Sequence, residues 1–318
     1  SHPVVPTEQT RQAYEALFGV LARDAFQTTP TGQVATSFPG AATVFSLNRK
    51  RTAQLVPTHR PLIAYDHLCG MIRSLTAAEA KPGASKFDAA ILAAESGPLD
   101  FPTAAGFHLQ ADLAVPSTPG RHRAVLLLVP DSIHGSDAIA HANLAQFNSL
   151  ATQGNVVLAV TPRPSPPGTE AMKAHILGPF YLLSLRADLV GRTLVGLRAD
   201  DVVRAVDYLS SRGDVDPTHI SAKASGHMGL VLLHAGVLDR RIRHIEVDHA
   251  LTSYRSLIDA PLPTGAPEDI IPGVLLHYDI PDLVRALGDR VEETNPLSGA
   301  DDLSQDSTPL QAISGTTP

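Results

Sequence analysis

The residues best placed to do chemistry lie in Lys223–Gly229, directly after an apolar run. A nucleophilic serine is commonly held on a tight strand-to-helix turn that requires small residues two positions before and after it. Counted from a strand that begins near Ile220, the tip of such a turn falls on Gly226, with Ala224 and Met228 as its flanks. Glycine has no nucleophilic atom, so this register predicts a turn without its catalytic group.

Two other registers of the same turn remain open. A tip at His227, flanked by Ser225 and Gly229, satisfies the size rule but supplies an imidazole instead of a hydroxyl. A tip at Ser225 has Lys223 and His227 as flanks, both too large for the turn. Ser225 is therefore either a nucleophile on a distorted turn or a serine at a helix N-terminus.

The elements around this segment alternate between strand and helix from about residue 86. Short apolar runs predict strands, and longer amphipathic stretches predict helices. One helix follows the polar loop after residue 130 and ends at about Gln153, and two others cover Leu194–Ser211 and Gly229–Leu238. This alternation is typical of a mainly parallel sheet flanked by helices. The predicted strands are Phe107–Val115, His122–Val129, Asn155–Val160, His219–Ala224 and Ile242–Val247.

The first 85 residues have a different pattern. Thr7–Phe26 is amphipathic at helical spacing, Gln33–Ser37 and Thr43–Leu47 alternate like a short hairpin, and residues 48–80 return to a helical pattern. We therefore expect an N-terminal helix and a linker or hairpin extension over residues 1–85, followed by an α/β domain over residues 86–318.

Several segments resemble one family. Gly191–Arg198, with Asp201–Leu209 after it, is similar to the helix that precedes the nucleophile strand in bacterial acetyl-xylan-esterase-like α/β-hydrolases, and Tyr254–Leu257 and Pro272–Leu283 are similar to the same group. The resemblance covers roughly residues 105 to 300 and implies the α/β-hydrolase fold. Thr31–Ser37 resembles the linker that follows the first hydrolase domain in longer, two-domain members of this family. This resemblance implies that the present chain is the C-terminal domain of such a protein, either complete or truncated at its C-terminal end.

The resemblance also locates the other parts of a hydrolytic site. In this fold the catalytic triad runs in the order nucleophile, acid, histidine. The acid loop corresponds to Thr294–Gly299, with Ser298 where family members typically carry aspartate, and Asp301 and Asp302 are near enough in sequence to substitute. No histidine follows His277, so the resemblance implies that the general base is missing.

A polar loop follows the predicted strand over residues 122–129. It contains Ser132, His134 and Gly135, where this fold builds part of its oxyanion hole. Both a functional polar pocket and a solvated loop histidine fit these residues. Farther along the chain, Asp201 and Arg204 are three residues apart on their predicted helix, which predicts a surface ion pair.

Composition excludes several classes of function. The net charge is −7, and the longest basic run is Arg49–Arg51. The sequence therefore predicts no basic surface for binding nucleic acid or an anionic membrane. Cys69 is the only cysteine, and the sequence has no zinc-type histidine motif, phosphate-binding loop or dinucleotide motif, so we expect neither metal nor cofactor. We also expect a soluble protein, because no apolar run approaches about 20 residues. Ser1–Pro3 does not begin a signal peptide, although the resemblance leaves a secreted or periplasmic location open.

Three functions remain as hypotheses. The first is a catalytically silent hydrolase-fold domain with a structural or interaction role beside an active esterase domain or subunit. The second is a carboxyl-ester hydrolase in which Ser225 acts with His227, His134 or a base from a partner chain. The third is a carbohydrate-binding module that uses the vestigial cleft, although 5% aromatic residues and no tryptophan remove the usual stacking platform.

Overall fold

The computed structural model describes Gln12 and residues 27–57, 60–103, 107–130, 138–163, 180–260, 263–301 and 303. The chain divides into two units, Ser1–Arg51 and Thr52–Pro318, and the second unit contains the sheet. The helix predicted over Thr7–Phe26 lies outside the described residues, with the exception of Gln12.

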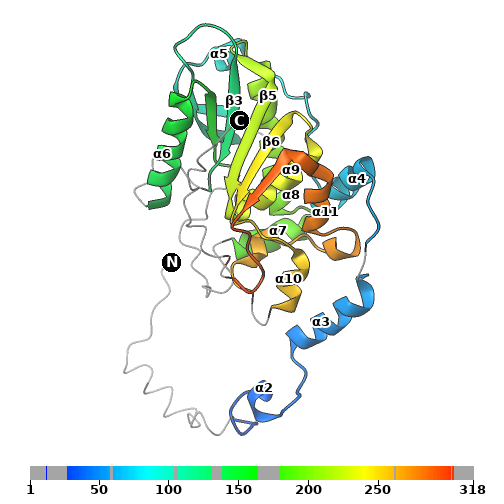
Figure 1. The fold of residues 1–318 in the computed structure, drawn as a ribbon. Helices are drawn as coiled ribbons and strands as arrows, with labels where there is room; N and C mark the ends of the chain where they lie inside the picture. The colour runs from blue at the N-terminus through cyan, green and yellow to red at the C-terminus, as the bar shows by residue number, and fades with distance from the viewer. Residues whose placement is uncertain are drawn as a thin grey trace. The chain divides into compact units, whose positions relative to one another are not determined.

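A sheet of seven strands forms the centre of the second unit (Figure 1). The strand order in the described part of the chain is β1-β2-β4-β3-β5-β6-β7. Strand β2 is antiparallel to β1 and β4, and every neighbouring pair from β4 to β7 is parallel. The strands are β1 (Gly97–Pro102), β2 (His108–Ala114), β3 (His122–Leu128), β4 (Val156–Val160), β5 (Val215–Ser225), β6 (Ile242–Asp248) and β7 (Val291–Thr294).

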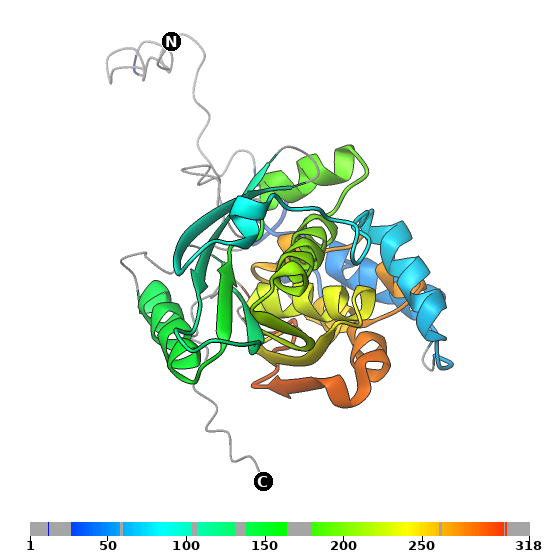
Figure 2. The same ribbon diagram turned by 90° about the horizontal axis from the view of Figure 1, so that it is seen from above.

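Helices cover both faces of this sheet. Helix α6 lies on one face, and α8 and α9 lie on the other with α4 packed on them (Figure 2). The α-helices are α2 (Val34–Ser37), α3 (Val44–Leu55), α4 (Tyr65–Thr76), α5 (Ala89–Leu92), α6 (Ala138–Thr152), α7 (Tyr181–Leu189), α8 (Leu194–Ser211), α9 (Gly226–Leu238), α10 (Tyr254–Asp259) and α11 (Ile280–Leu287). Three short 3₁₀ helices follow α10, namely η2 (Ala266–Asp269), η3 (Val274–Leu276) and η4 (Gly288–Arg290).

The central strands are apolar throughout because both of their faces are buried. On β3, alternate side chains from Ala124 to Leu128 join the core beneath α8 and α9. The side chains between them, from Val125 to Val129, pack with Phe147 of α6 on the opposite face. The period of two along the strand therefore supplies both cores from one continuous apolar run.

Helix α8 is anchored where it begins. The Thr193 hydroxyl accepts the Gly196 N–H at 3.0 Å, which is a side-chain cap of the first turn, and donates to the Thr76 carbonyl at 3.2 Å. Gly196 is required because a Cβ there would lie 2.1 Å from the Thr76 carbonyl oxygen. Helix α4 therefore sits directly on α8, and its Leu68 and Ile72 are buried in the main core although the sequence assigned them to the extension.

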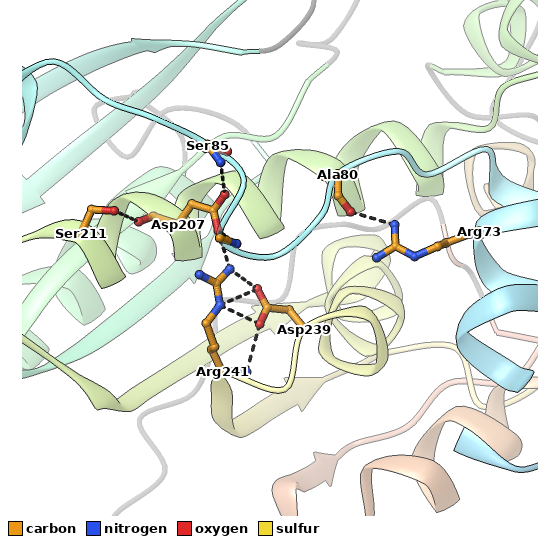
Figure 3. A network of polar contacts seen from close by, with 8 residues as sticks. Arg73, Ala80, Ser85, Asp207, Ser211, Asp239 and Arg241 are labelled. Atoms are coloured by element: carbon orange, nitrogen blue, oxygen red, sulfur yellow. Dashed lines mark hydrogen bonds and ion pairs between the residues drawn. The ribbon is translucent and has the colours of Figure 1, made fainter. Parts of the chain in front are cut away.

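A polar network holds the connection between α4 and β1 against α8 (Figure 3). The Asp207 carboxylate accepts the backbone N–H groups of Gly83 at 2.6 Å and Ser85 at 2.9 Å. The Arg241 guanidinium donates to Asp207 and also to Asp239, at 2.6 Å. One buried carboxylate therefore joins three segments that are distant in sequence.

The structure confirms the strands predicted from apolar runs, which correspond to β2 through β6, and the helix predicted over Leu194–Ser211. The sequence pattern did not predict β1 or β7. Strand β1 contains Pro98 and Pro102, which are compatible with its place at the sheet edge but weaken a strand signal. Strand β7 reads Val-Glu-Glu-Thr and has a single apolar residue.

The predicted hairpin over residues 33–47 is wrong. Its two arms form α2 and the beginning of α3. The Thr43 N–H donates to the Ser46 hydroxyl at 2.9 Å, and the Ser46 N–H donates to the Thr43 hydroxyl at 3.2 Å. This reciprocal pair resembles a capping box at the N-terminus of a helix. These local bonds favour helix, whereas an isolated two-stranded hairpin is only marginally stable.

We predict that Asp207→Asn lowers the free energy of unfolding by about 1–3 kcal/mol at pH 7, because Arg241 and two backbone amides lose a charged acceptor. Burial alone would raise the pKa of Asp207, but hydrogen bonds, including those from Ser85 and Arg241, lower it overall. The carboxylate therefore stabilises the fold above its unfolded-state pKa of about 4, and the loss caused by the variant should shrink as the pH falls below that value.

Urea unfolding measures this loss. Asp88→Asn is the matched control, because Asp88 is exposed on the same connection and makes no capping hydrogen bond. Equal midpoints for the two variants at pH 7 would contradict the prediction.

Candidate functional site

The turn between β5 and α9 has its tip at Gly226. Ser225 ends β5 in an extended conformation, with φ −127° and ψ 158°. Gly226 has φ +56° and begins α9, so His227 already lies inside the helix. A left-handed backbone suits glycine and costs other residues free energy. The backbone therefore matches the first of the three registers, in which Gly226 lies at the tip and supplies no nucleophilic atom.

The residues around this tip are tightly packed. Ala224 is fully buried and Met228 is 3% exposed, although Met228 occupies a flank where a small residue is expected. Gly229 lies against β6 and the residues after it, since a Cβ on it would be 3.0 Å from the Cβ of Ala250 and 3.5 Å from that of Val247. The packing therefore requires Gly229 to be small, whereas it accommodates a long side chain at Met228.

His227 is buried against two carboxylates. Its Nδ1 lies 2.8 Å from Asp269 Oδ2, and its Nε2 lies 3.5 Å from Glu268 Oε1. All three side chains are no more than 4% exposed. Both ring nitrogens therefore face acidic partners, which fixes the imidazole in place beside the turn.

The same carboxylates are tied to α8. Arg198 Nη1 donates to Glu268 Oε2 at 2.6 Å, and the guanidinium stacks 4.7 Å from the ring centroid of Phe180. Arg198 is 1% exposed, so this is a buried ion pair. Truncating one partner of such a pair typically costs about 3–5 kcal/mol, because the other charge is left unpaired in the interior. We call Arg198, His227, Glu268 and Asp269 the elbow cluster.

A second acid–histidine pair lies at the end of β6. His249 Nδ1 is 3.0 Å from Asp248 Oδ2, and the other oxygen of Asp248 accepts hydrogen bonds from Thr294 Oγ1 at 2.8 Å and Asn295 Nδ2 at 2.9 Å. His249 has φ +52° and Asn295 has φ +45°. Non-glycine residues in this conformation are uncommon and cluster at functional sites.

Ser225 lies beside this pair. It is the register partner of Asp248, which in turn pairs with Thr294, so these residues form a row across the carboxyl ends of β5, β6 and β7. Within the described residues the Ser225 hydroxyl makes no hydrogen bond, either to a histidine or as a cap of α9. The sequence patterns assigned no role to Asp248 or His249. An acid followed directly by histidine after a predicted strand was the available signal.

The predicted acid loop forms a local turn. The backbone N–H and the hydroxyl of Ser298 donate to Asp301 Oδ2 at 2.7 and 2.9 Å, and these bonds lower the pKa of Asp301. Asp301 contacts no histidine in the described ranges. Asp302 and the oxyanion-loop candidates Ser132, His134 and Gly135 lie outside the described residues.

Two further findings concern the described part of the chain. No group of three or more histidine, cysteine, aspartate or glutamate side chains is arranged to hold a metal ion. None of the helices described there has the length and apolar composition that a membrane crossing requires.

Comparison with known proteins supports the fold. No protein-family model matches the sequence, and no curated protein matches it significantly. A candidate acetyl xylan esterase from Bacteroides fragilis superposes with a TM-score of 0.58 and 12% identity, over 80% of this chain and 76% of that chain. Acetyl Xylan Esterase 1 from a Thermoanaerobacterium species superposes with a TM-score of 0.50 and 16% identity, over 80% of this chain and 85% of that chain.

These similarities and the strand order define an α/β-hydrolase fold, as the sequence predicted. The mainly parallel sheet flanked by helices is the fold of proteins named as acetyl xylan esterases, which confirms the predicted resemblance at the level of the fold. Since fold does not determine activity, function depends on the residues at the turn.

We predict that Gly226→Ala lowers the free energy of unfolding by about 1–2 kcal/mol, because alanine is strained at a φ of +56°. Gly213→Ala is the control, since a Cβ there meets no atom within 4 Å and its φ is outside the left-handed region. Thermal unfolding should show a melting temperature a few degrees lower for the first variant only. Equal melting temperatures would show that the turn adapts without cost.

Proposed function

We propose that this chain is a catalytically silent α/β-hydrolase-fold domain with a structural or interaction role beside an active esterase domain or subunit. The observation that carries the proposal is Gly226 at the tip of the strand-to-helix turn, with φ +56°. Serine hydrolysis by this fold needs a hydroxyl at that point. Gly226 has no side-chain atom that could form an acyl-enzyme.

The elbow cluster supports the same proposal. A general base must present an unoccupied nitrogen to the nucleophile, while its other nitrogen is oriented by an acid. In His227 one nitrogen is 2.8 Å from Asp269 and the other faces Glu268. The imidazole nearest to the turn therefore serves a buried ionic cluster and has no nitrogen directed to a substrate.

The N-terminal region supports an interaction role. Helix α3 has no buried residue and exposes Val44, Phe45, Leu47 and Leu55. Apolar side chains gathered on one short segment are typical of a surface that another protein covers. We propose an esterase domain or subunit as that partner, in line with the resemblance of Thr31–Ser37 to an interdomain linker.

A carboxyl-ester hydrolase is the second candidate, and one observation favours it. The imidazole of His249 is 21% exposed and its Nδ1 is oriented toward Asp248, beside Ser225 at the same sheet edge. An acid that orients a histidine near a serine is the arrangement of a hydrolytic triad. The acetyl xylan esterases of the same fold suggest acetylated polysaccharide as the substrate class.

We predict that the purified chain hydrolyses 4-nitrophenyl acetate no faster than a heat-treated control. No side chain in the described structure is both placed at the turn and activated as a nucleophile. Ser225→Ala and His249→Gln should leave this background rate unchanged. Turnover that is lost in both variants, with their folds intact, would overturn the proposal and support the second candidate.

We also predict that Gly226→Ser creates no efficient esterase. Triad members act as a unit, so a serine without a base recovers little of the roughly million-fold contribution of the complete set. The hydrolysis rate of the variant is compared with that of the parent chain under identical conditions. A gain of about a thousand-fold or more would show that a histidine already reaches the turn, which contradicts a purely structural role for the site.

A further inference from the structure

A cavity of about 510 Å³ lies beside α8 and shares no lining residue with the turn at Gly226. Its lining includes Lys81, Phe107, Arg163, Arg192 and Arg204, and we call it the arginine pocket. The volume is in the range of small-molecule sites in proteins. A ligand there would be a property beyond the proposed function of the turn.

The fold brings these residues together from five segments. Strands β2 and β4 are antiparallel, so Phe107 just before β2 and Arg163 just after β4 meet at one edge of the sheet. Arg192 precedes α8 and Arg204 lies within it, while Lys81 is on the connection that Asp207 fastens to α8.

Two of the arginines are held in fixed orientations. Arg163 donates from Nε to Asp201 at 3.1 Å and from Nη1 to Thr103 at 3.2 Å, and its guanidinium lies 5.5 Å from the ring centroid of Phe107. Arg192 donates to the Ala77 carbonyl at 2.7 Å and to Glu79 at 2.5 Å. Fixed guanidinium groups lose less entropy when they bind an anion than mobile side chains do.

The side chains of two further cations form no hydrogen bond or ion pair with the described part of the chain. Arg204 makes neither a hydrogen bond nor an ion pair there, although the charges of Asp207 and Asp201 act on it, and its guanidinium stacks 5.0 Å from the ring centroid of Phe87. Its side chain is half-buried, and this burial lowers the pKa of the guanidinium. The side chain of Lys81 is exposed and makes no polar contact with the described residues. A partly buried, unpaired cation is unfavourable, and an anion would relieve it.

The surrounding carboxylates do not balance these charges. The lining holds four cations, Lys81 and three arginines, against the carboxylates of Glu79, Asp200 and Asp201. Asp200 accepts backbone N–H groups of residues 79 and 80. Burial raises the pKa of Asp201 to about 7 despite the nearby Arg163, so this group is only partly ionised at neutral pH. The lining itself therefore holds more cations than ionised carboxylates, and this difference grows as the pH falls.

We propose that the arginine pocket binds a small carboxylate whose flat apolar face lies against Phe107. Planar guanidinium groups match the two oxygens of a carboxylate, and the guanidinium of Arg204 makes no hydrogen bond to the described residues. Phe107 is 62% exposed and presents a ring beside Arg163 on which such a face can stack. The ligand class is thus an organic acid with a planar or ring-shaped body.

Titration calorimetry on the full chain tests the proposal with benzoate as the probe and benzamide as its neutral counterpart. We expect benzoate to bind, and benzamide to bind at least ten-fold more weakly. Inorganic phosphate is a third probe. If phosphate binds as tightly as benzoate and depends on the same arginines, the site recognises any oxyanion and the stacking part of the proposal is overturned.

Variants locate the binding. Arg204→Gln should weaken benzoate binding about ten-fold or more, and Lys81→Gln provides a second test because its exposed side chain has no structural contact. Arg243→Gln is the matched control, since Arg243 is exposed on β6 outside the pocket. Circular dichroism checks that each variant is folded. Unchanged binding in both pocket variants overturns the proposal.

The pH dependence gives an independent readout. The charged groups that face Asp201 are Asp200, Arg163 and Arg204. Because Asp201 takes up a proton near pH 7, benzoate should bind several-fold more tightly at pH 6 than at pH 8. Asp201→Asn should reduce this difference while keeping the acceptor for the Arg163 N–H. An absent or inverted dependence in the wild-type chain, or no benzoate binding at any pH, overturns the proposal.

Discussion

Helix α8 carries charged side chains into the interior, and the arrangement of the neighbouring segments depends on their partners. Arg198, Asp201 and Asp207 are each no more than 1% exposed. An unpaired ion at such a place costs several kcal/mol. Their partners come from separate parts of the chain: Glu268 in η2, Arg163 after β4, and Arg241 before β6. Satisfying these charges therefore fixes the segments around α8 more specifically than apolar packing alone, which tolerates many arrangements.

This constraint also limits the chemistry at the turn. Glu268 is held by Arg198, and the adjacent Asp269 is thereby placed 2.8 Å from His227. The imidazole beside the turn belongs to a structural ionic cluster that extends back to α8. The backbone of the turn needs a glycine and close packing around it. Hydrolysis needs a nucleophilic side-chain atom as well, and neither glycine nor close packing supplies one. The packing that holds the turn is therefore independent of whether a nucleophile stands at its tip.

Local patterns in the sequence predicted the elements that depend on local preferences. Apolar runs located β3 and β4, and counting along β5 placed the tip of the turn on Gly226. The predicted surface pair of Asp201 with Arg204 is wrong, because Asp201 is buried against Arg163, which lies 38 residues earlier in the chain. The topology of the sheet brings Arg163 and Asp201 together although they are far apart in the sequence. The three-residue spacing of two side chains on one helix cannot predict such a long-range pair. The link between His227 and Asp269 was missed for the same reason.

The carboxyl ends of β5, β6 and β7 share one unusual feature. Each strand is followed at once by a left-handed residue, Gly226, His249 or Asn295. Asp248 accepts a hydrogen bond from Asn295, and the backbone N–H of His249 donates to the Thr294 carbonyl at 3.0 Å. Left-handed conformations of non-glycine residues cost about 1 kcal/mol or more each and persist only where the surroundings impose them. These local hydrogen bonds therefore help to hold both strained residues, and neither bond involves an atom at the tip of the neighbouring turn.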